Sequence, residues 1–486
     1  MSGVTKASKY IYFTNVSRRG AGTITEVRWL SDDETVRYRA VFTDPTAWRI
    51  WTAATISYFG DFVGLGALLL AGYARSGGHP LGSALVFGIQ AVPAFVISAV
   101  IGPWLDRIPR RGGLITLSLL GGAAVALPII FSGLWAVLVA AAAIGGIRTA
   151  FTSVRTGAIA DGVPRTVRGR LVALLSTSNQ LSEVVGYVAG SSVAIAIGTG
   201  TALAADAATF VIAAALLAGL RLPTAERSPH RASMTTGIRT IFGDRTLALL
   251  VPVAWVGLAL GAVPQSLAAA ALKTDRGWVP AALAAMAAGL AISATVVGRT
   301  ALSERILAQF CWMTASGAAF MLTALGMRAD PRLVVAGNFL VGLSFGWAVA
   351  AQTTFIHVIP VERMAHVTST MIGSLIVLEG AGAVAAGAIA GAFGVPAAYL
   401  LGGASLTVTA LAAIGYGRTH TRALDISRPH VGAPPMEAFQ PPAGELLPGQ
   451  PPRTPCPLRK RGRVLALPER RVRRERRGRP GAEHGA

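Results

Sequence analysis

Residues 48–72 read WRIWTAATISYFGDFVGLGALLLAG, a run in which only Arg49 and Asp61 are charged. A helix needs roughly 20 apolar residues to cross the core of a bilayer, and this run is long enough. A carboxylate near the middle of a span is unfavourable by roughly 2.5–3.5 kcal/mol if it faces lipid. We therefore expect a membrane helix whose Asp61 points into the protein.

Similar apolar runs recur along the whole chain and predict an all-α polytopic membrane protein of twelve transmembrane helices in two halves of six. The spans are predicted near residues 48–72, 81–105, 114–133, 134–158, 171–196 and 200–220, and then near 246–270, 279–298, 306–327, 332–357, 367–393 and 396–416. The predicted domains are a cytoplasmic segment 1–46, a first half 47–220, a cytoplasmic loop 221–245, a second half 246–417 and a disordered Pro/Arg-rich tail 418–486.

The composition of the 486-residue chain favours the same class. Only 14% of its residues are charged and 52% are hydrophobic, whereas soluble proteins carry about 25% charged residues. A net charge of +21 would suggest nucleic-acid binding in a soluble protein, but basic residues collect on the cytoplasmic side of membrane proteins. We therefore expect no nucleic-acid partner. Two cysteines predict no disulfide framework.

Basic residues are distributed unevenly over the predicted connections. With the N-terminus inside, five lie in outer connections, namely Arg75, Lys273, Arg276, Arg328 and Arg332. Fifteen lie in cytoplasmic ones, namely Arg107, Arg110, Arg111, Arg155, Arg165, Arg168, Arg170, Arg221, Arg227, Arg231, Arg239, Arg245, Arg299, Arg305 and Arg363. This bias supports an even number of spans and predicts a multi-pass protein of the inner (plasma) membrane with both termini in the cytoplasm.

The two halves repeat one another at an offset of 196 residues without a gap. Gly102, Gly146, Pro164, Glu183 and Gly186 are matched by Gly298, Gly342, Pro360, Glu379 and Gly382. Glycine matches are common in a chain with 56 glycines. A match between two buried acids, Glu183 and Glu379, is uncommon. A parallel repeat of this kind predicts a substrate path between the halves.

The connection between the second and third spans reads Gly102-Pro-Trp-Leu-Asp106-Arg107-Ile-Pro-Arg110-Arg111. Its aspartate can accept hydrogen bonds from a helix N-terminus of the other half, and its arginines can hold that carboxylate and lipid phosphates. We expect a gating loop that closes the cytoplasmic side. An ordinary basic hairpin is the alternative.

This loop resembles the G-x-x-x-D-R-x-x-R-R loop of the major facilitator superfamily, and the resemblance covers roughly residues 47–417. Within that superfamily the chain looks most like macrolide and siderophore exporters, through Ser57–Asp61, Val163–Arg170 and Asp206-Ala-Ala-Thr-Phe210. The second-half loop, 298–305, lacks the aspartate. The fifth span has Gly186-Tyr187 where drug/proton exporters usually show Gly-Pro. The resemblance implies a carrier that rocks its halves about a midplane site.

Four ionisable residues fall near the middle of apolar runs: Asp61, Arg148, Glu183 and Glu379. The resemblance places the first and fourth spans around a central cavity, so Asp61 is the predicted proton site and Arg148 its partner or a contact for an anionic substrate. Glu183 and Glu379 either bind protons or hydrogen-bond between the halves. Asp206, near the outer end of the sixth span, is interpreted as a helix-end or packing residue.

These features predict a secondary transporter that couples protons to the efflux of a hydrophobic or amphipathic small molecule. The alternatives are a permease that imports a small metabolite and a transport-inactive sensor that uses the basic tail. We expect a monomer whose cytoplasmic arginines contact anionic lipid headgroups. The sequence shows no phosphate loop, metal-ligand spacing or nucleophile elbow, so we expect no enzyme activity, no cofactor and no metal.

Overall fold

The computed structural model describes residues 38–101, 108–222, 234–297, 306–359 and 364–419. All of them belong to one compact unit. The predictions for residues 1–37 and for the tail 420–486 lie outside the described residues.

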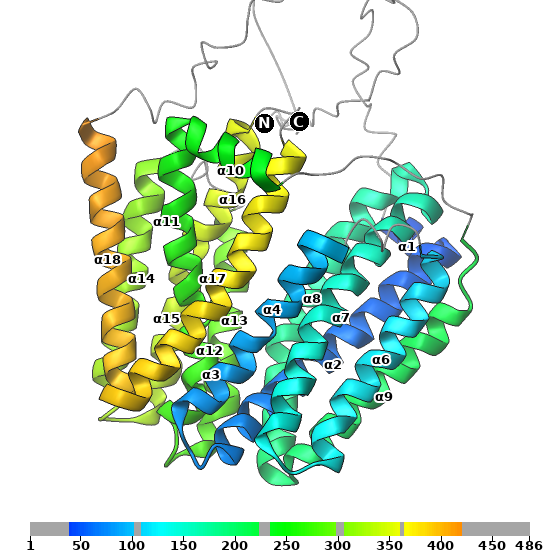
Figure 1. Cartoon of the computed structure of the whole chain (residues 1–486), viewed down its shortest axis with the longest axis horizontal. Coiled ribbons are helices and arrows are strands. Elements are labelled where there is room, and N and C mark those ends of the chain that lie inside the picture. The colour runs from blue at the N-terminus through cyan, green and yellow to red at the C-terminus, as the bar shows by residue number, and fades with distance from the viewer. Residues whose placement is uncertain (1–37, 102–107, 223–233, 298–305, 360–363, 420–486) are drawn as a thin grey trace, which may run out of the picture. The chain divides into compact units, whose positions relative to one another are not determined.

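The helices of the first half follow the six spans predicted there (Figure 1). They are α1 (Arg39–Thr43), α2 (Pro45–Arg75), α3 (Pro80–Ile89), α4 (Ala91–Val96), the π-helical η2 (Ile97–Ile101), α6 (Arg110–Ile130), α7 (Leu134–Gly162), α8 (Arg165–Ala196) and α9 (Thr199–Ala218).

The second half repeats this pattern after a short helix in the predicted cytoplasmic loop. Its elements are α10 (Met234–Gly243), α11 (Arg245–Gly261), α12 (Val263–Ala271), the 3-10 turn η3 (Arg276–Trp278), α13 (Val279–Val297), α14 (Ile306–Gly326), α15 (Pro331–Ser344), α16 (Gly346–Val358), α17 (Met364–Phe393) and α18 (Val395–Thr419). Helix α10 was not predicted.

The predicted fold class is confirmed, because every regular element of the described residues is helical and each predicted span coincides with one helix or with consecutive short ones. Nine segments of the described residues are long and apolar enough to cross a membrane. The remaining predicted spans coincide with the interrupted segment α3–α4–η2 and with α8 and α14.

Local sequence signals set several helix ends. Asp44 caps α2, since its Oδ1 accepts hydrogen bonds from the backbone N–H groups of Thr46 at 3.0 Å and Ala47 at 2.7 Å, and Pro45 occupies the first helical position. One predicted span divides into α11 and α12 at Ala262. Pro264 follows this break; proline lacks the N–H of a continuous helix and clashes with the preceding turn.

The internal repeat is visible in how equivalent helices pack. A Cβ atom on Gly186 of α8 would lie 2.7 Å from Cβ of Phe62 and 3.3 Å from the backbone N of Val63, both on α2. A Cβ on Gly382 of α17 would collide with the carbonyl of Ala259 on α11. Val63 and Ala259 are themselves 196 positions apart. Small residues let membrane helices approach closely, so the two halves use the same close contact at equivalent positions.

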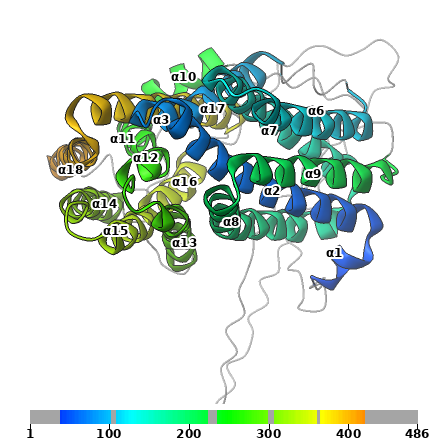
Figure 2. The ribbon, with the colours of Figure 1, turned by 90° about the horizontal axis from the view of Figure 1, so that it is seen from below.

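The contacts between the halves begin at one end of their helices, which we call the closed end and which carries connections 76–79, 197–198 and 272–278. They continue along α3 and α4, which lie against α17. One apolar core there includes Leu69 and Ala202 of the first half and Leu272 and Leu283 of the second. Helix α3 lies beside α17 and α8 lies beside α13 (Figure 2). Where α3 meets α17, a Cβ atom on Gly391 would lie 2.5 Å from the His79 ring.

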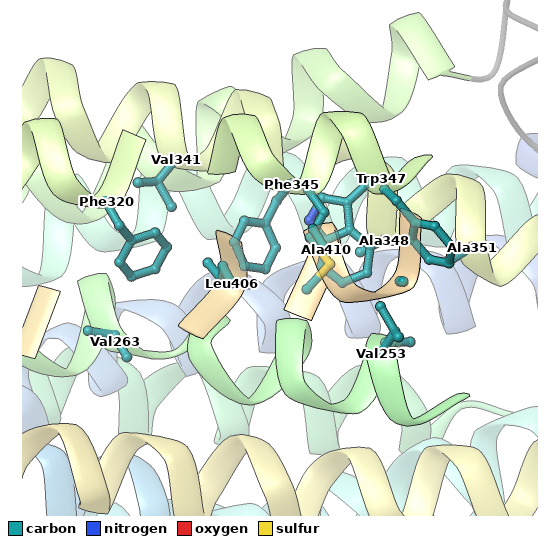
Figure 3. Packing of buried hydrophobic residues seen from close by; sticks show 14 of the residues in the cluster. Val253, Val263, Phe320, Val341, Phe345, Trp347, Ala348, Ala351, Leu406 and Ala410 are labelled. Atoms are coloured by element: carbon teal, nitrogen blue, oxygen red, sulfur yellow. The ribbon is translucent and has the colours of Figure 1, made fainter. Parts of the chain in front are cut away.

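Two further cores lie within single halves. One, around Ile50, Leu114 and Leu217, belongs to the first half alone. The other belongs to the second half, where Phe345 and Trp347 pack at 5.8 Å between ring centroids. Figure 3 shows these two rings near Leu406 and Val253, in the same core. Each half therefore keeps a core of its own, while the shared core holds them together at the closed end.

Candidate functional site: a charge cluster between the two halves

Asp61 lies on α2 and is buried, with 9% of its surface exposed. Within the described residues, no hydrogen bond or ion pair to its carboxylate is found. Two arginines of α7, Arg148 and Arg155, lie within electrostatic range of it. A buried carboxylate without direct partners is unusual, because burial of a charged group is unfavourable unless it is paired. Asp61 is therefore placed to change its charge or its partner.

Arg148 connects acids from both halves. It lies within electrostatic range of Asp61 and Glu183 of the first half and of Glu379 of the second. Its side chain is exposed, and an arginine at the middle of a span avoids lipid. The neighbouring carboxyl groups indicate that it faces the interior between the halves.

Glu183 lies on α8 and is half-buried. Its Oε1 accepts a hydrogen bond of 3.2 Å from Nε2 of Gln265 on α12. This bond crosses from one half to the other, which is the structural role considered for Glu183 alongside proton binding. Tyr187, one turn further along α8, is buried against the ring of Phe62 at 5.4 Å and lies within electrostatic range of Glu183.

Glu379 lies on α17 beside a tight contact between the halves. A Cβ atom on the next residue, Gly380, would lie 2.5 Å from Ala91 Cβ and 2.8 Å from the carbonyl of Gly88. Glu379 is half-buried and lies within electrostatic range of both Arg148 and Glu183. The structure thus brings the two repeat-related acids together around one arginine.

Arg155 is a member of the cluster that the sequence analysis missed. The prediction that it lies in a cytoplasmic connection is wrong, because α7 continues to Gly162 and Arg155 is buried within it. Its guanidinium carbon lies 5.1 Å from the centroid of the Tyr58 ring and 5.9 Å from that of Phe151. Among the described residues, its Nη1 has no hydrogen-bond partner. Its spacing of seven residues from Arg148, which places both on one helix face, could have revealed it.

The predicted gating loop is described only in part. Gly102, Asp106 and Arg107 lie outside the described residues. Arg110 begins α6, and its Nε pairs with Oδ2 of Asp161 on α7 at 3.2 Å, while Arg111 is exposed. This ion pair ties the start of α6 to the end of α7, opposite the closed end.

Three carboxyl groups, those of Asp61, Glu183 and Glu379, lie within electrostatic range of Arg148, and Arg155 supplies a second guanidinium group near Asp61. One carboxyl group therefore has no guanidinium to balance it. A carboxylate that no guanidinium balances can bind a proton or a cationic ligand in a partly buried site. The cluster can bind either one at the interface between the two halves, which are built from duplicated helices.

Duplicated bundles of membrane helices around a central charge cluster define a polytopic membrane transporter. More particularly, the chain belongs to the Major Facilitator Superfamily, whose sequence profile matches residues 50–375. No curated protein sequence matches the chain.

Solved structures share the fold at low sequence identity. The nucleoside transporter NupG is 12% identical with a TM-score of 0.59, over 75% of this chain and 98% of that one. A bacterial homolog of the human lysosomal transporter Spinster, inward-facing and unoccupied, is 15% identical with a TM-score of 0.60, over 79% and 98%. The peptide transporter POT in complex with sulfate is 11% identical with a TM-score of 0.60, over 80% and 99%.

Proposed function

We propose that this transporter exports a hydrophobic or amphipathic small molecule in exchange for protons, as macrolide and siderophore exporters do. The two halves rock about the charge cluster and expose it to the two sides of the membrane in turn. The direction of transport rests on the resemblance at Ser57–Asp61 and Asp206–Phe210.

The observation that carries this proposal is the surplus carboxyl group around Arg148. A proton and a cationic group of the substrate compete for the same carboxylate, so the site holds one or the other. Mutual exclusion at a single site is the requirement for exchange. Since Glu379 comes from the second half and Asp61 from the first, a change of charge also alters the attraction between the halves.

The closed end has a defined side of the membrane in this proposal. If the N-terminus lies in the cytoplasm, as the basic connections indicate, the closed end faces outward. The opposite end of the helices then faces the cytoplasm, where an exporter loads its substrate. The inner membrane, the cytoplasmic termini and the monomeric state belong to this proposal.

The test is transport by inverted membrane vesicles that carry the full chain. The probe is ethidium, or another toxic amphipathic cation against which overexpression protects growing cells. The Asp61→Asn variant should be expressed normally and should lose transport driven by the proton gradient. The matched control is Asp275→Asn, which removes an exposed acid outside the cluster and should retain proton-driven transport. Undiminished proton-driven transport by Asp61→Asn would exclude Asp61 as the exchange site.

Deletion of residues 420–486 separates this proposal from a sensor that acts through its basic tail. Helix α18 ends at Thr419, so the deletion leaves the last helix complete. The truncated exporter should keep its transport rate, whereas a sensor would lose its signal with the tail.

A further inference from the structure

Asp206 is a second buried aspartate near Asp61 that the proposed exchange does not use. It belongs to the motif Asp206–Phe210 of α9, and only 2% of its surface is exposed. The hydroxyl of Thr209 lies 3.4 Å from Asp206 Oδ1 and also donates a hydrogen bond of 2.7 Å to the Asp206 backbone carbonyl. Its carboxyl group therefore receives at most one weak side-chain hydrogen bond within the described residues.

The carboxyl group of Asp206 fills a notch in the surface of α2. Gly60 and Gly64 lie one turn apart on that helix, on either side of Asp61. A Cβ atom on Gly60 would lie 2.7 Å from Asp206 Oδ1, and one on Gly64 would collide with Oδ2. With no side chains in between, the carboxyl group faces the bare backbone of α2. Asp206 thus packs against the middle of α2, not at a helix end.

The backbone of α2 at this notch can accept a hydrogen bond from a donor on another helix. In the middle of a helix every N–H group is already bonded to a carbonyl of the same helix, so α2 offers no free donor to a carboxylate. Each carbonyl oxygen keeps a second lone pair that can accept another hydrogen bond. A protonated carboxyl group can donate to it, and an ionised one cannot.

The helices packed against α9 supply no positive charge near Asp206. Within the described membrane segments, residues 50–74 of α2 carry only Asp61 as a charge, residues 112–130 of α6 carry none, and residues 171–196 of α8 carry only Glu183. Tyr58, Tyr73 and Tyr187 are the other titratable groups of these stretches. Asp61 is the charged group within electrostatic range of Asp206, and its negative charge would repel a second one.

We propose that Asp206 carries a resident proton throughout the transport cycle and donates it in a hydrogen bond to the backbone of α2. The bond holds α2 against α9. Of the two neighbouring aspartates, Asp61 and Asp206, Asp61 is then the one that exchanges its proton. Asp206 is thus a positioning residue of the first half. The inference about Asp61 rests on the proposed function; the inference about the proton on Asp206 does not.

The experiment combines infrared spectroscopy with transport assays on the full chain in lipid nanodiscs and vesicles. The wild type should show the C=O stretching band of a protonated carboxylic acid from about pH 5 to pH 9, although a free aspartate is ionised above about pH 4. The variant Asp206→Asn should lose the part of this band that persists up to pH 9. Because its amide can also donate to α2, it should keep the transport rate within about twofold and the same pH profile.

The variant Asp206→Leu has a similar size but no donor, and should lose transport or thermal stability relative to Asp206→Asn. The proposal is overturned if the wild type lacks the band, if Asp206→Asn shifts the pH profile, or if Asp206→Asn fails to assemble while Asp206→Leu assembles. If the Asp61→Asn variant kept proton-coupled transport, the proposed exchange would be contradicted. The infrared band of Asp206 would still show that Asp206 carries a proton.

Discussion

Gln265 of α12 donates a hydrogen bond of 3.2 Å to the carboxylate of Glu183 on α8, and so joins the second half to the first. Helix α12 begins beyond the break at Ala262 and also contributes Ala268 to the shared core of the closed end. When that end opens, α8 and α12 must separate. The bond between these residues is therefore expected to break once in each cycle.

Gln265→Leu should shift the protein away from the closed arrangement, because a hydrogen bond to a charged group contributes roughly 1.5–3 kcal/mol. The distance between spin labels on Ser132 and Lys273, two exposed residues at the closed end of different halves, measures this shift after both cysteines are replaced. Gln180→Leu alters the same type of side chain on α8 without touching the bond. Identical distance distributions for the two variants would contradict a stabilising role for Gln265.

Gly190→Ala should destabilise the first half, since its Cβ would collide with the carbonyl of Val63 on α2. Overpacking of this kind costs about 1–3 kcal/mol, and a lower thermal unfolding temperature in detergent should report it. Gly169→Ala is the control on the same helix, because its Cβ meets open space and alanine favours a helix by up to ~1 kcal/mol. Equal stability of both variants would show that α2 and α8 can move apart freely.

Tyr399→Phe should weaken the second half by about 1–3 kcal/mol, the cost of leaving a buried polar group unpaired. The hydroxyl of Tyr399 donates to Asn338 Oδ1 at 3.2 Å, and Asn338 Nδ2 donates to the carbonyl of Ala282 at 3.2 Å. This chain of bonds links α18, α15 and α13. Thermal unfolding compared with Tyr38→Phe, at an exposed position before α1, measures the loss. A stability loss no larger than that of the control would contradict the prediction.

The ion pair between Arg110 and Asp161 should contribute roughly 1 kcal/mol, the upper end for pairs near the surface. Their side chains are 12% and 24% exposed, so the contribution should fall as salt is added. A double-mutant cycle of Arg110→Gln and Asp161→Asn isolates it from the other interactions of each residue. Additive effects of the two substitutions would show that the pair does not hold α6 to α7.

The twelve spans could be predicted because each needs a long apolar run, and length and hydropathy are visible in the sequence. The breaks at Ala262 and Phe345 could not, since packing decides where a helix that contains proline or glycine is interrupted. Asp61, Glu183 and Glu379 could be singled out as candidates because an acid stands out in an apolar run. Arg155 was missed because it lies near the end of its span, where arginines usually face the cytoplasm.

The contacts of Asp206 could not be predicted from the sequence, for a different reason. Its motif was recognised, but its position near the outer end of the predicted sixth span suggested a helix-end or packing residue. Its contact with Gly60 and Gly64 depends on the approach of α2 and α9, which no local pattern encodes. The cluster around Arg148 likewise requires the two halves to be brought together, whereas the repeat indicated only that Glu183 and Glu379 are equivalent.

The central claim is that proton binding at Asp61 moves the two halves. The most direct test needs no substrate and measures the distance between spin labels on Ser132 and Lys273 as a function of pH. In the wild type the populations of the closed and opened arrangements should change with pH. In Asp61→Asn they should stay constant over the same range, because the charge that reorganises the cluster has been removed. A pH-dependent shift of the same size and midpoint in Asp61→Asn would contradict this mechanism.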